Sequence, residues 1–168
     1  MKKTNIYSPG DKRKINPDWF TNRVHMKDIS SKIKSTGHDI YHVYFENGAK
    51  TKLHMHNGNQ ILIVTKGIGS LETFKKYGTN KTNIKIKKTE KITLKEGDIV
   101  HISSNTLHSH GASNKNTFSH IAINILPSKN SEYKTIWYES DFGKKEKKII
   151  WLEMSVKKSS EIETIPGN

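Results

Sequence analysis

The chain has 168 residues and a formal net charge of +13 at pH 7, and hydrophobic residues make up 32% of it. This length suits one domain with a modest core. The absence of cysteine excludes disulfides, thiolate zinc sites and cysteine nucleophiles. No run of residues approaches the roughly 20 apolar positions of a transmembrane helix, and the polar start of the sequence lacks the apolar region of a signal peptide. We therefore expect a soluble, cytoplasmic protein with no membrane partner.

The positive charge comes almost entirely from lysine. Arg13 and Arg23 are the only arginines, whereas specific recognition of bases and phosphates favours the rigid, bidentate arginine side chain. The lysines gather at both ends of the chain and between Lys75 and Lys95. Isoleucine and asparagine are abundant too, so a genome-wide bias in amino-acid composition explains the many lysines. We expect them to lie on the solvated surface. We expect no specific nucleic-acid partner.

The first 18 residues are polar and basic and contain the turn signals Pro9-Gly10 and Asn16-Pro17. They predict a flexible N-terminal arm over residues 1–18. From Trp19 onward, short runs rich in β-branched residues alternate with turn residues, which is typical of a β-sandwich or barrel. The predicted strands include, in chain order, residues 41–45, 61–65, 84–87, 92–94, 99–102 and 120–126.

The end of the chain contains two further apolar segments. Residues 128–137 place Tyr133, Ile136 and Trp137 at a spacing that predicts one short helix packed against the barrel. Residues 149–152 predict a last strand within a basic C-terminal extension. The expected organisation is therefore an arm over 1–18, a β-barrel over 19–143 and an extension over 144–168.

Nine histidines are present, and their positions carry more information than their number. His54 and His56 lie two residues apart, so on a strand both imidazoles point to one face. His108 and His110 repeat this arrangement after a predicted turn. His120 begins a strand that places Ala122 and Asn124 on its own face, and the opposite face then consists of Ile121, Ile123 and Ile125.

A metal ion explains this pattern economically. A divalent first-row ion binds neutral imidazoles and an amide or carboxylate oxygen, and its ligands must converge from different strands. The interior of a barrel supplies that convergence, because alternate residues of every strand face inward. The alternative is that these histidines only fill polar positions on half-exposed strands. Two His-x-His pairs favour the metal site over that alternative.

Two motifs resemble those of the cupin superfamily. The run Gly48-x5-His54-x-His56-x3-Gln60-x6-Gly67 is similar to the first cupin motif, with Gln60 where many members have glutamate. Gly97-Asp98-Ile99-Val100, followed by His108, is similar to the second. Here the usual proline and glycine of the turn are replaced by Ser104 or its neighbour and by Asn105, which still tolerates a left-handed conformation. The segment between the motifs is longer than usual, and Lys75–Lys91 predicts an enlarged hairpin loop.

The resemblance implies an all-β cupin fold, a double-stranded β-helix or jelly-roll barrel, with one bound divalent transition metal ion. Manganese is the first expectation, and iron, zinc, nickel or cobalt are alternatives. By matching position, the implied metal ligands are His54, His56, Gln60 and His108. His110 and His120 are implied to lie beside the ion as catalytic acid and base. We assign no role to Trp19, Trp137 or Trp151.

The similarity extends to one subgroup of small single-domain cupins. Residues 19–24, 56–69, 108–112 and 119–123 resemble a group that includes manganese-dependent hydroxynitrile lyases and cupins associated with carboxymuconolactone decarboxylase. This implies a lyase or isomerase acting on a small hydroxy or carbonyl compound. A ligand set without an anionic side chain would make the ion a stronger Lewis acid. A metal-dependent dioxygenase and a non-catalytic small-molecule-binding cupin remain the alternatives.

The predicted strand 61–65 also bears on assembly. Ile61 and Ile63 alternate with Leu62 and Val64, so both faces of this strand are apolar. The outward face must be covered by another segment or by a second subunit. We predict a homodimer.

Overall fold

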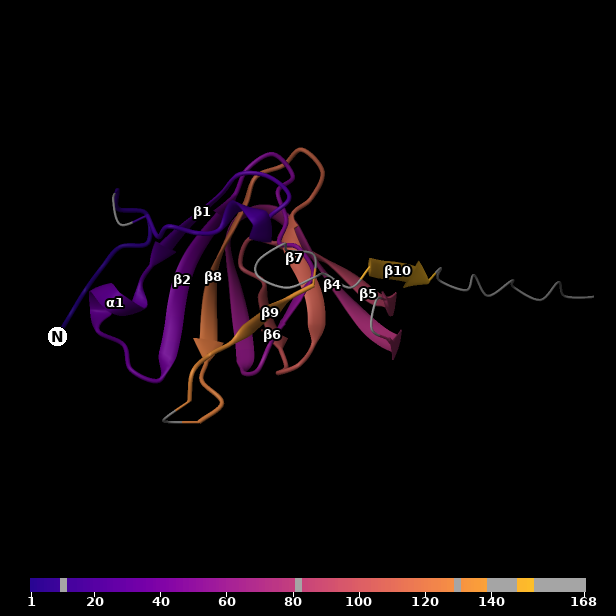
Figure 1. Ribbon diagram of the computed structural model, residues 1–168. Coiled ribbons are helices and arrows are strands. Elements are labelled where there is room, and N and C mark those ends of the chain that lie inside the picture. The colour runs from indigo at the N-terminus through magenta and orange to yellow at the C-terminus, as the bar shows by residue number, and fades with distance from the viewer. Residues whose placement is uncertain (10–11, 81–82, 129–130, 139–147, 153–168) are drawn as a thin grey trace, which may run out of the picture.

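The computed structural model describes residues 1–9, 12–80, 83–128, 131–138 and 148–152 (Figure 1). Most of the predicted C-terminal extension therefore lies outside the described residues. The described part is almost entirely β-structure, which confirms the predicted fold class. Its elements are η1 (Pro17–Trp19), β1 (Val24–Asp28), α1 (Ser30–Ile33), β2 (His38–Phe45), β3 (His54–His56), β4 (Asn59–Thr79), β5 (Asn83–Lys95), β6 (Ile99–Ile102), β7 (Leu107–Ala112), β8 (Phe118–Ile125), β9 (Thr135–Trp137) and β10 (Lys148–Leu152).

The strands form a curled jelly-roll sheet in the order β1-β2-β8-β4-β7-β3-β9. The strand β4 is 21 residues long and connects the two halves of the fold. Its first part pairs with β8 and β6, and its second part pairs with β7 and β5. All pairings are antiparallel except that of β10 with β5. At one side of the molecule, the hairpin of β4 and β5 projects together with β10 (Figure 1).

Inward-facing apolar side chains fill the space between the two halves. Phe45, Leu62 and Phe118 are fully buried, and they belong to a core cluster contributed mainly by β2, β4 and β8. A second cluster is formed by residues of β4, β5, the start of β7 and the position before β3, and it consists of Leu53, Phe74, Ile84, Ile86 and Leu107. Burying one such side chain contributes roughly 1.5–3 kcal/mol. Successive side chains along each strand point alternately into and out of the sheet.

A left-handed backbone occurs inside strand β4, at Gly67, and in the turn before β7, at Asn105. Gly67 has a φ of 81°, and a Cβ at this position would lie 2.2 Å from the carbonyl oxygen of Thr117. Asn105 has a φ of 60°, and its backbone N–H donates to the carbonyl of His56 at 2.7 Å. The expectation that Asn105 takes the place of a turn glycine is therefore confirmed. This bond joins the turn before β7 to β3.

The structure differs from the sequence predictions at two places. The helix predicted within 128–137 is wrong, because Thr135–Trp137 forms β9 and pairs with β3. Thr135 and Trp137 point inward, and Ile136 between them is 51% exposed. The hydrogen bonds gained by pairing with β3 favour a strand over the helix that the residue spacing predicts. The predicted loop Lys75–Lys91 is mostly hairpin strand, with Ile84 and Ile86 buried. The predicted strand near residues 149–152 is confirmed as β10, at the edge of β5.

The N-terminal arm lies along the edge strand β1. Lys12 forms an antiparallel bridge with Lys27. Lys27 is buried, with 7% of the residue exposed. Its ammonium group donates to the carbonyl oxygens of Asn5 and Ser8 at 2.8 and 3.0 Å. The backbone N–H of Arg13 donates to the Met26 carbonyl at 2.7 Å. In the part of the chain that the structure describes, no helix is long and apolar enough to cross a membrane.

Candidate metal centre

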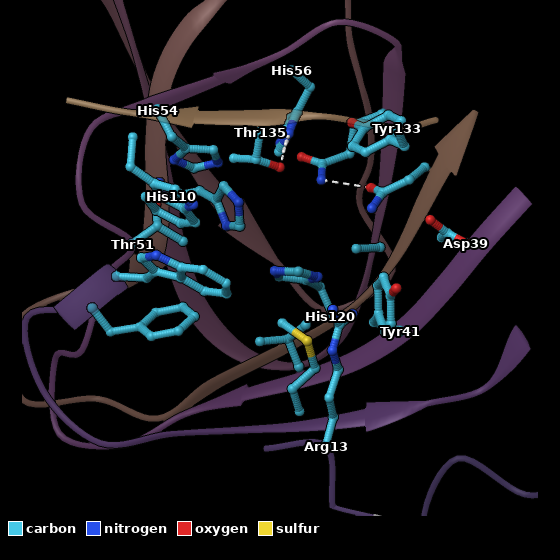
Figure 2. A pocket seen from close by; sticks show the side chains of 18 of the residues that line it. Arg13, Asp39, Tyr41, Thr51, His54, His56, His110, His120, Tyr133 and Thr135 are labelled. Atoms are coloured by element: carbon cyan, nitrogen blue, oxygen red, sulfur yellow. Dashed lines mark hydrogen bonds between the residues drawn. The ribbon is translucent and has the colours of Figure 1, made fainter. Parts of the chain in front are cut away.

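A cavity of about 560 Å³ opens between the two halves of the sheet (Figure 2). Its lining combines histidines, aromatic rings and a few amides and hydroxyls. The lining residues are Arg13, Trp19, Phe20, Met26, Asp39, Tyr41, Val43, Phe45, Thr51, His54, His56, Gln60, His110, His120, Ala122, Asn124, Tyr133, Thr135, Ile136 and Trp137. Five of the six residues predicted for the site are among them, and the sixth, His108, is completely buried beside them.

The pairing of β3 with β7 brings the two His-x-His motifs together. His54 lies directly opposite His108, and their ring centroids are 4.2 Å apart. His110 is two residues farther along the same face of β7. One nitrogen from each of His54, His108 and His110 lies within 4.8 Å of the others. Ligand nitrogens about 2 Å from a common ion are spaced at most about 4 Å apart, so this group is close to the geometry that a metal requires.

The other two predicted ligands border this group. The ring of His56 lies 4.9 Å from that of His54 and 5.3 Å from that of His108, centroid to centroid. The amide nitrogen of Gln60 donates to Asn124 Oδ1 at 2.9 Å. This bond turns the Gln60 carbonyl oxygen away from Asn124 and leaves it buried and unpartnered among the described residues. Both side chains thus offer donor atoms beside the three grouped imidazoles.

Hydrogen bonds set the orientation of three imidazoles. Nδ1 of His54 lies 2.8 Å from the carbonyl oxygen of Lys52, and Nδ1 of His108 lies 2.8 Å from that of Thr106. A carbonyl only accepts, so both Nδ1 atoms carry the hydrogen and both Nε2 atoms present a lone pair. Nδ1 of His56 lies 2.9 Å from the Thr135 hydroxyl. Such bonds to the outer nitrogen are usual for histidines that bind metals.

Burial keeps these imidazoles neutral. Loss of solvation is the largest cause in every case, and it lowers the pKa of His56 to about 3 and that of His108 to about 4. The pKa values of His54 and His110 also lie well below their ordinary value, because each is buried and faces other imidazoles. Neutral imidazoles retain the lone pair that a metal ion needs.

His120 approaches the cluster from β8. It shares an inward face with Ala122 and Asn124, as the sequence predicted, whereas the isoleucines of this strand face outward. Its ring lies 5.0 Å from that of His110 and 5.5 Å from that of Phe45. Burial, as the largest cause, lowers the pKa of His120 to about 3. His120 is therefore a neutral imidazole on the cavity wall.

Several buried donor atoms in this region lack a partner in the described structure. They are His56 Nε2, Gln60 Oε1, His108 Nε2, His110 Nδ1 and both ring nitrogens of His120, together with Trp19 Nε1 and the Tyr133 hydroxyl. A buried polar atom without a hydrogen bond costs about 1–3 kcal/mol, so native proteins rarely accumulate them. Neutral nitrogens and an amide oxygen are suitable ligands for a divalent first-row ion. The residues present therefore fit the metal that the sequence predicts.

Aromatic residues without a predicted role form part of the wall. Trp137 stacks on His54 with a centroid distance of 4.5 Å and on Trp19 at 5.2 Å. Tyr133 lies over His56 at 4.9 Å. In the sequence, the alternation Thr135-Ile136-Trp137 is compatible with a strand that places the polar-tipped side chains of Thr135 and Trp137 on one face. The spacing of Tyr133, Ile136 and Trp137 instead predicts a helix, and a helix does not imply either contact.

Histidines outside the predicted motifs lie away from the cavity lining. His101 is exposed on the outer face of β6. His25 forms a 2.6 Å contact with Glu46. His42 lies 3.2 Å from the hydroxyl of Thr65. The separation of motif and non-motif histidines by the two faces of the sheet supports the pattern from which the site was predicted.

Comparisons with known proteins agree with this architecture. The family model for Cupin matches residues 5–136. A cupin-like protein from Thermotoga maritima is 30% identical, with 84% of this chain and 94% of that chain covered and a TM-score of 0.59. No curated protein sequence matches.

A structure of Bacillus subtilis oxalate decarboxylase, described for its Mn(II) centres, is similar to this chain in fold. It is 19% identical with a TM-score of 0.50, and the match covers 68% of this chain and 27% of that chain. This chain thus corresponds to about a quarter of the decarboxylase. The match over residues 5–136 and the shared fold show that the chain belongs to the cupin family.

Proposed function

We propose that this cupin is a metal-dependent lyase or isomerase that acts on a small hydroxy or carbonyl compound. The supporting observation is the set of buried, neutral imidazoles and one amide oxygen that converge on the cavity without protein partners. In this proposal, His54, His56, Gln60 and His108 hold one divalent ion, manganese first among the candidates. When bound, the ion supplies Lewis acidity toward a substrate oxygen.

His110 and His120 are proposed to move the proton. Both are neutral and buried, and their rings lie 5.0 Å apart on the cavity side of β7 and β8. A ring nitrogen of either can accept the proton of a substrate hydroxyl. The electron pair left on oxygen then forms a carbonyl as the adjacent carbon–carbon bond breaks, and the leaving group departs with the electrons of that bond. For a cyanohydrin, the products are an aldehyde and cyanide.

The cavity wall is proposed to position the substrate. The backbone N–H of His110 donates to the Thr51 hydroxyl at 3.0 Å, which fixes this part of β7. The ring of Phe45 contacts both His110 and His120 at 5.9 and 5.5 Å. These contacts limit the orientations of both rings and leave room on the cavity side. Phe20, Val43 and Ala122 add apolar side chains to the lining, which makes the surroundings of the reacting atoms less polar.

Elemental analysis and a cleavage assay test the proposal. Purified protein is expected to contain about one divalent ion per chain, and His108→Ala is expected to lose it. With racemic mandelonitrile, His110→Phe is expected to retain the ion and to lose benzaldehyde release by about 10²-fold or more. His101→Ala, on the outer face, serves as the matched control and should match wild type.

The outcomes separate the alternatives. Loss of the ion in His110→Phe would make His110 a ligand, as its proximity to His54 and His108 allows, and would contradict its proposed role. Oxygen consumption that depends on substrate and iron would indicate a dioxygenase. A metal-free wild-type protein, or ligand binding without turnover of any hydroxy or carbonyl compound, would refute the lyase or isomerase.

We also propose a homodimer formed through the outer face of the sheet. Ile99 is 70% exposed and lies beside Ile63, which in turn lies beside Ile121. The next row places Ile61 beside Ile123 in the same way. A contiguous row of isoleucines across β6, β4 and β8 is costly to leave in water. Light scattering on purified protein tests the assembly.

A further inference from the structure

The N-terminal arm places an arginine at the mouth of the cavity. The backbone of Arg13 is fixed to β1 through its bond to the Met26 carbonyl. Its guanidinium carbon lies 4.8 Å from the centre of the Tyr41 ring, and Figure 2 shows the side chain extending toward His120. Contact with the Tyr41 ring and a side-chain interaction with this residue restrict the guanidinium, which still has further N–H donors. The Arg13 side chain is therefore held at the mouth of the cavity by these contacts, although the residue is exposed to solvent.

Charge around the cavity is sparse. Of the described residues that line it, only Arg13 and Asp39 carry a formal charge near neutral pH. Figure 2 shows the Tyr41 ring between these two side chains, with Asp39 farther from His120. Asp39 contributes to raised pKa values of Tyr41 and Tyr133, for which burial is the largest cause, whereas Arg13 acts on Tyr41 in the opposite direction. Arg13 is thus the only positively charged side chain among the described lining residues, and it lies on the His120 side of the cavity.

The described carboxylates near Arg13 form no ion pair with it, and its side chain also interacts with Tyr41. Asp28 interacts with Arg13 electrostatically, but its Oδ1 accepts hydrogen bonds from Ser30 Oγ and the Ser31 backbone at 2.8 and 3.1 Å. Within the described ranges, no carboxylate forms an ion pair with Arg13 at 4 Å or less. A stacked guanidinium beside a largely apolar cavity is suited to bind a planar carboxylate in bidentate fashion.

We infer that the preferred substrates of this site carry a carboxylate, and that Arg13 is the residue that selects them over neutral analogues such as cyanohydrins. The class is small 2-hydroxy or 2-oxo acids, with the carboxylate at Arg13 and the reacting oxygen toward the histidines. This inference rests on the function proposed above, because it names the substrate class of the same site. It also gives the arm a role in specificity that the β-barrel alone does not supply.

Binding of a matched pair of probes tests the inference. Mandelate and mandelamide have nearly the same shape, but only mandelate is an anion. Trp19 and Trp137 line the cavity, so tryptophan fluorescence can follow both titrations in manganese-loaded and in metal-free protein. Wild type is expected to bind mandelate about tenfold more tightly than mandelamide in both forms, the ratio expected for one charge-assisted interaction.

Three variants assign the preference to one side chain. Arg13→Gln is expected to reduce the ratio to about one and to leave mandelamide binding unchanged, whereas Arg13→Lys should retain part of the preference. Arg23→Gln is the matched control. Arg23 is the other arginine of the chain, its side chain is 73% exposed, and it faces Glu46 at 3.9 Å away from the cavity lining.

The possible results are distinct. Equal affinities in wild type, or a preference that persists in Arg13→Gln, would overturn the inference, as would equal weakening of both probes by that substitution. A preference confined to metal-loaded protein and insensitive to Arg13 would assign the carboxylate to the ion instead. Because the readout is binding, failure of the lyase assay leaves this test intact.

Discussion

Five buried histidines make the metal-free protein sensitive to acid. The folded-state pKa values of His56, His108 and His120 are about 3, 4 and 3, against an ordinary value of 6.5. Above pH 6.5, the folded and unfolded chains both hold these imidazoles neutral. Below pH 6.5, only the unfolded chain takes up protons. The free energy of unfolding therefore falls as the pH falls from 6.5 toward the folded-state pKa values.

The magnitude follows from these pKa values. At pH 5.0, proton uptake by the unfolded chain costs about 2 kcal/mol of stability for each of the three groups, or about 6 kcal/mol together. His54 and His110 change stability in the same direction. A domain of this size is typically stable by only about 5–15 kcal/mol. Most of the stability present at pH 7.5 is therefore expected to be lost at pH 5.0.

Urea unfolding of chelator-treated protein at pH 7.5 and pH 5.0 measures this loss. His120→Phe removes one of the three groups and should reduce the pH-dependent loss by about 2 kcal/mol. His101→Gln changes an exposed histidine on β6 and should leave the loss as in wild type. A free energy of unfolding that differs by less than about 1 kcal/mol between the two pH values would refute the argument from burial.

Three further substitutions test the fold and the assembly. Phe45→Ala removes a fully buried ring that contacts Phe118, and denaturant unfolding is expected to show a loss of about 3–5 kcal/mol. Gly67→Ala is expected to cost about 2 kcal/mol or more in the same assay, because φ is 81° and the Cβ would meet the Thr117 carbonyl. Ile121→Lys is expected to convert a dimer of 19.2 kDa subunits into monomers in light scattering, with an unchanged circular dichroism spectrum; a monomeric wild type would contradict the dimer.

The barrel and its histidine cluster were predictable because their signals are local. Residues two apart on a strand share a face, so the spacing of His54 and His56 and of His108 and His110 already placed each pair on one side. The turn residues between apolar runs gave most strand positions. Asn105 could be assigned to a left-handed turn because asparagine, apart from glycine, is one of the few residues that readily adopts that conformation.

What the sequence left undetermined depends on long-range pairing. The segment ending in Trp137 has helical spacing in isolation, and it becomes a strand because β3 offers an unpaired edge. The position of Arg13 depends on a bridge between the arm and β1, which no local pattern encodes. Nor does spacing show that His110 lies as close to His54 and His108 as a ligand would.

The direct pairing of His54 with His108 also has a kinetic consequence. About fifty residues separate these two positions, and all of β4, β5 and β6 lie between them. The chain must close this large loop before the first two imidazoles from different motifs meet, and loop closure of this kind slows folding. Nascent chains therefore have no preformed chelating pair from the two motifs, and capture of the ion is expected to follow collapse of the polypeptide.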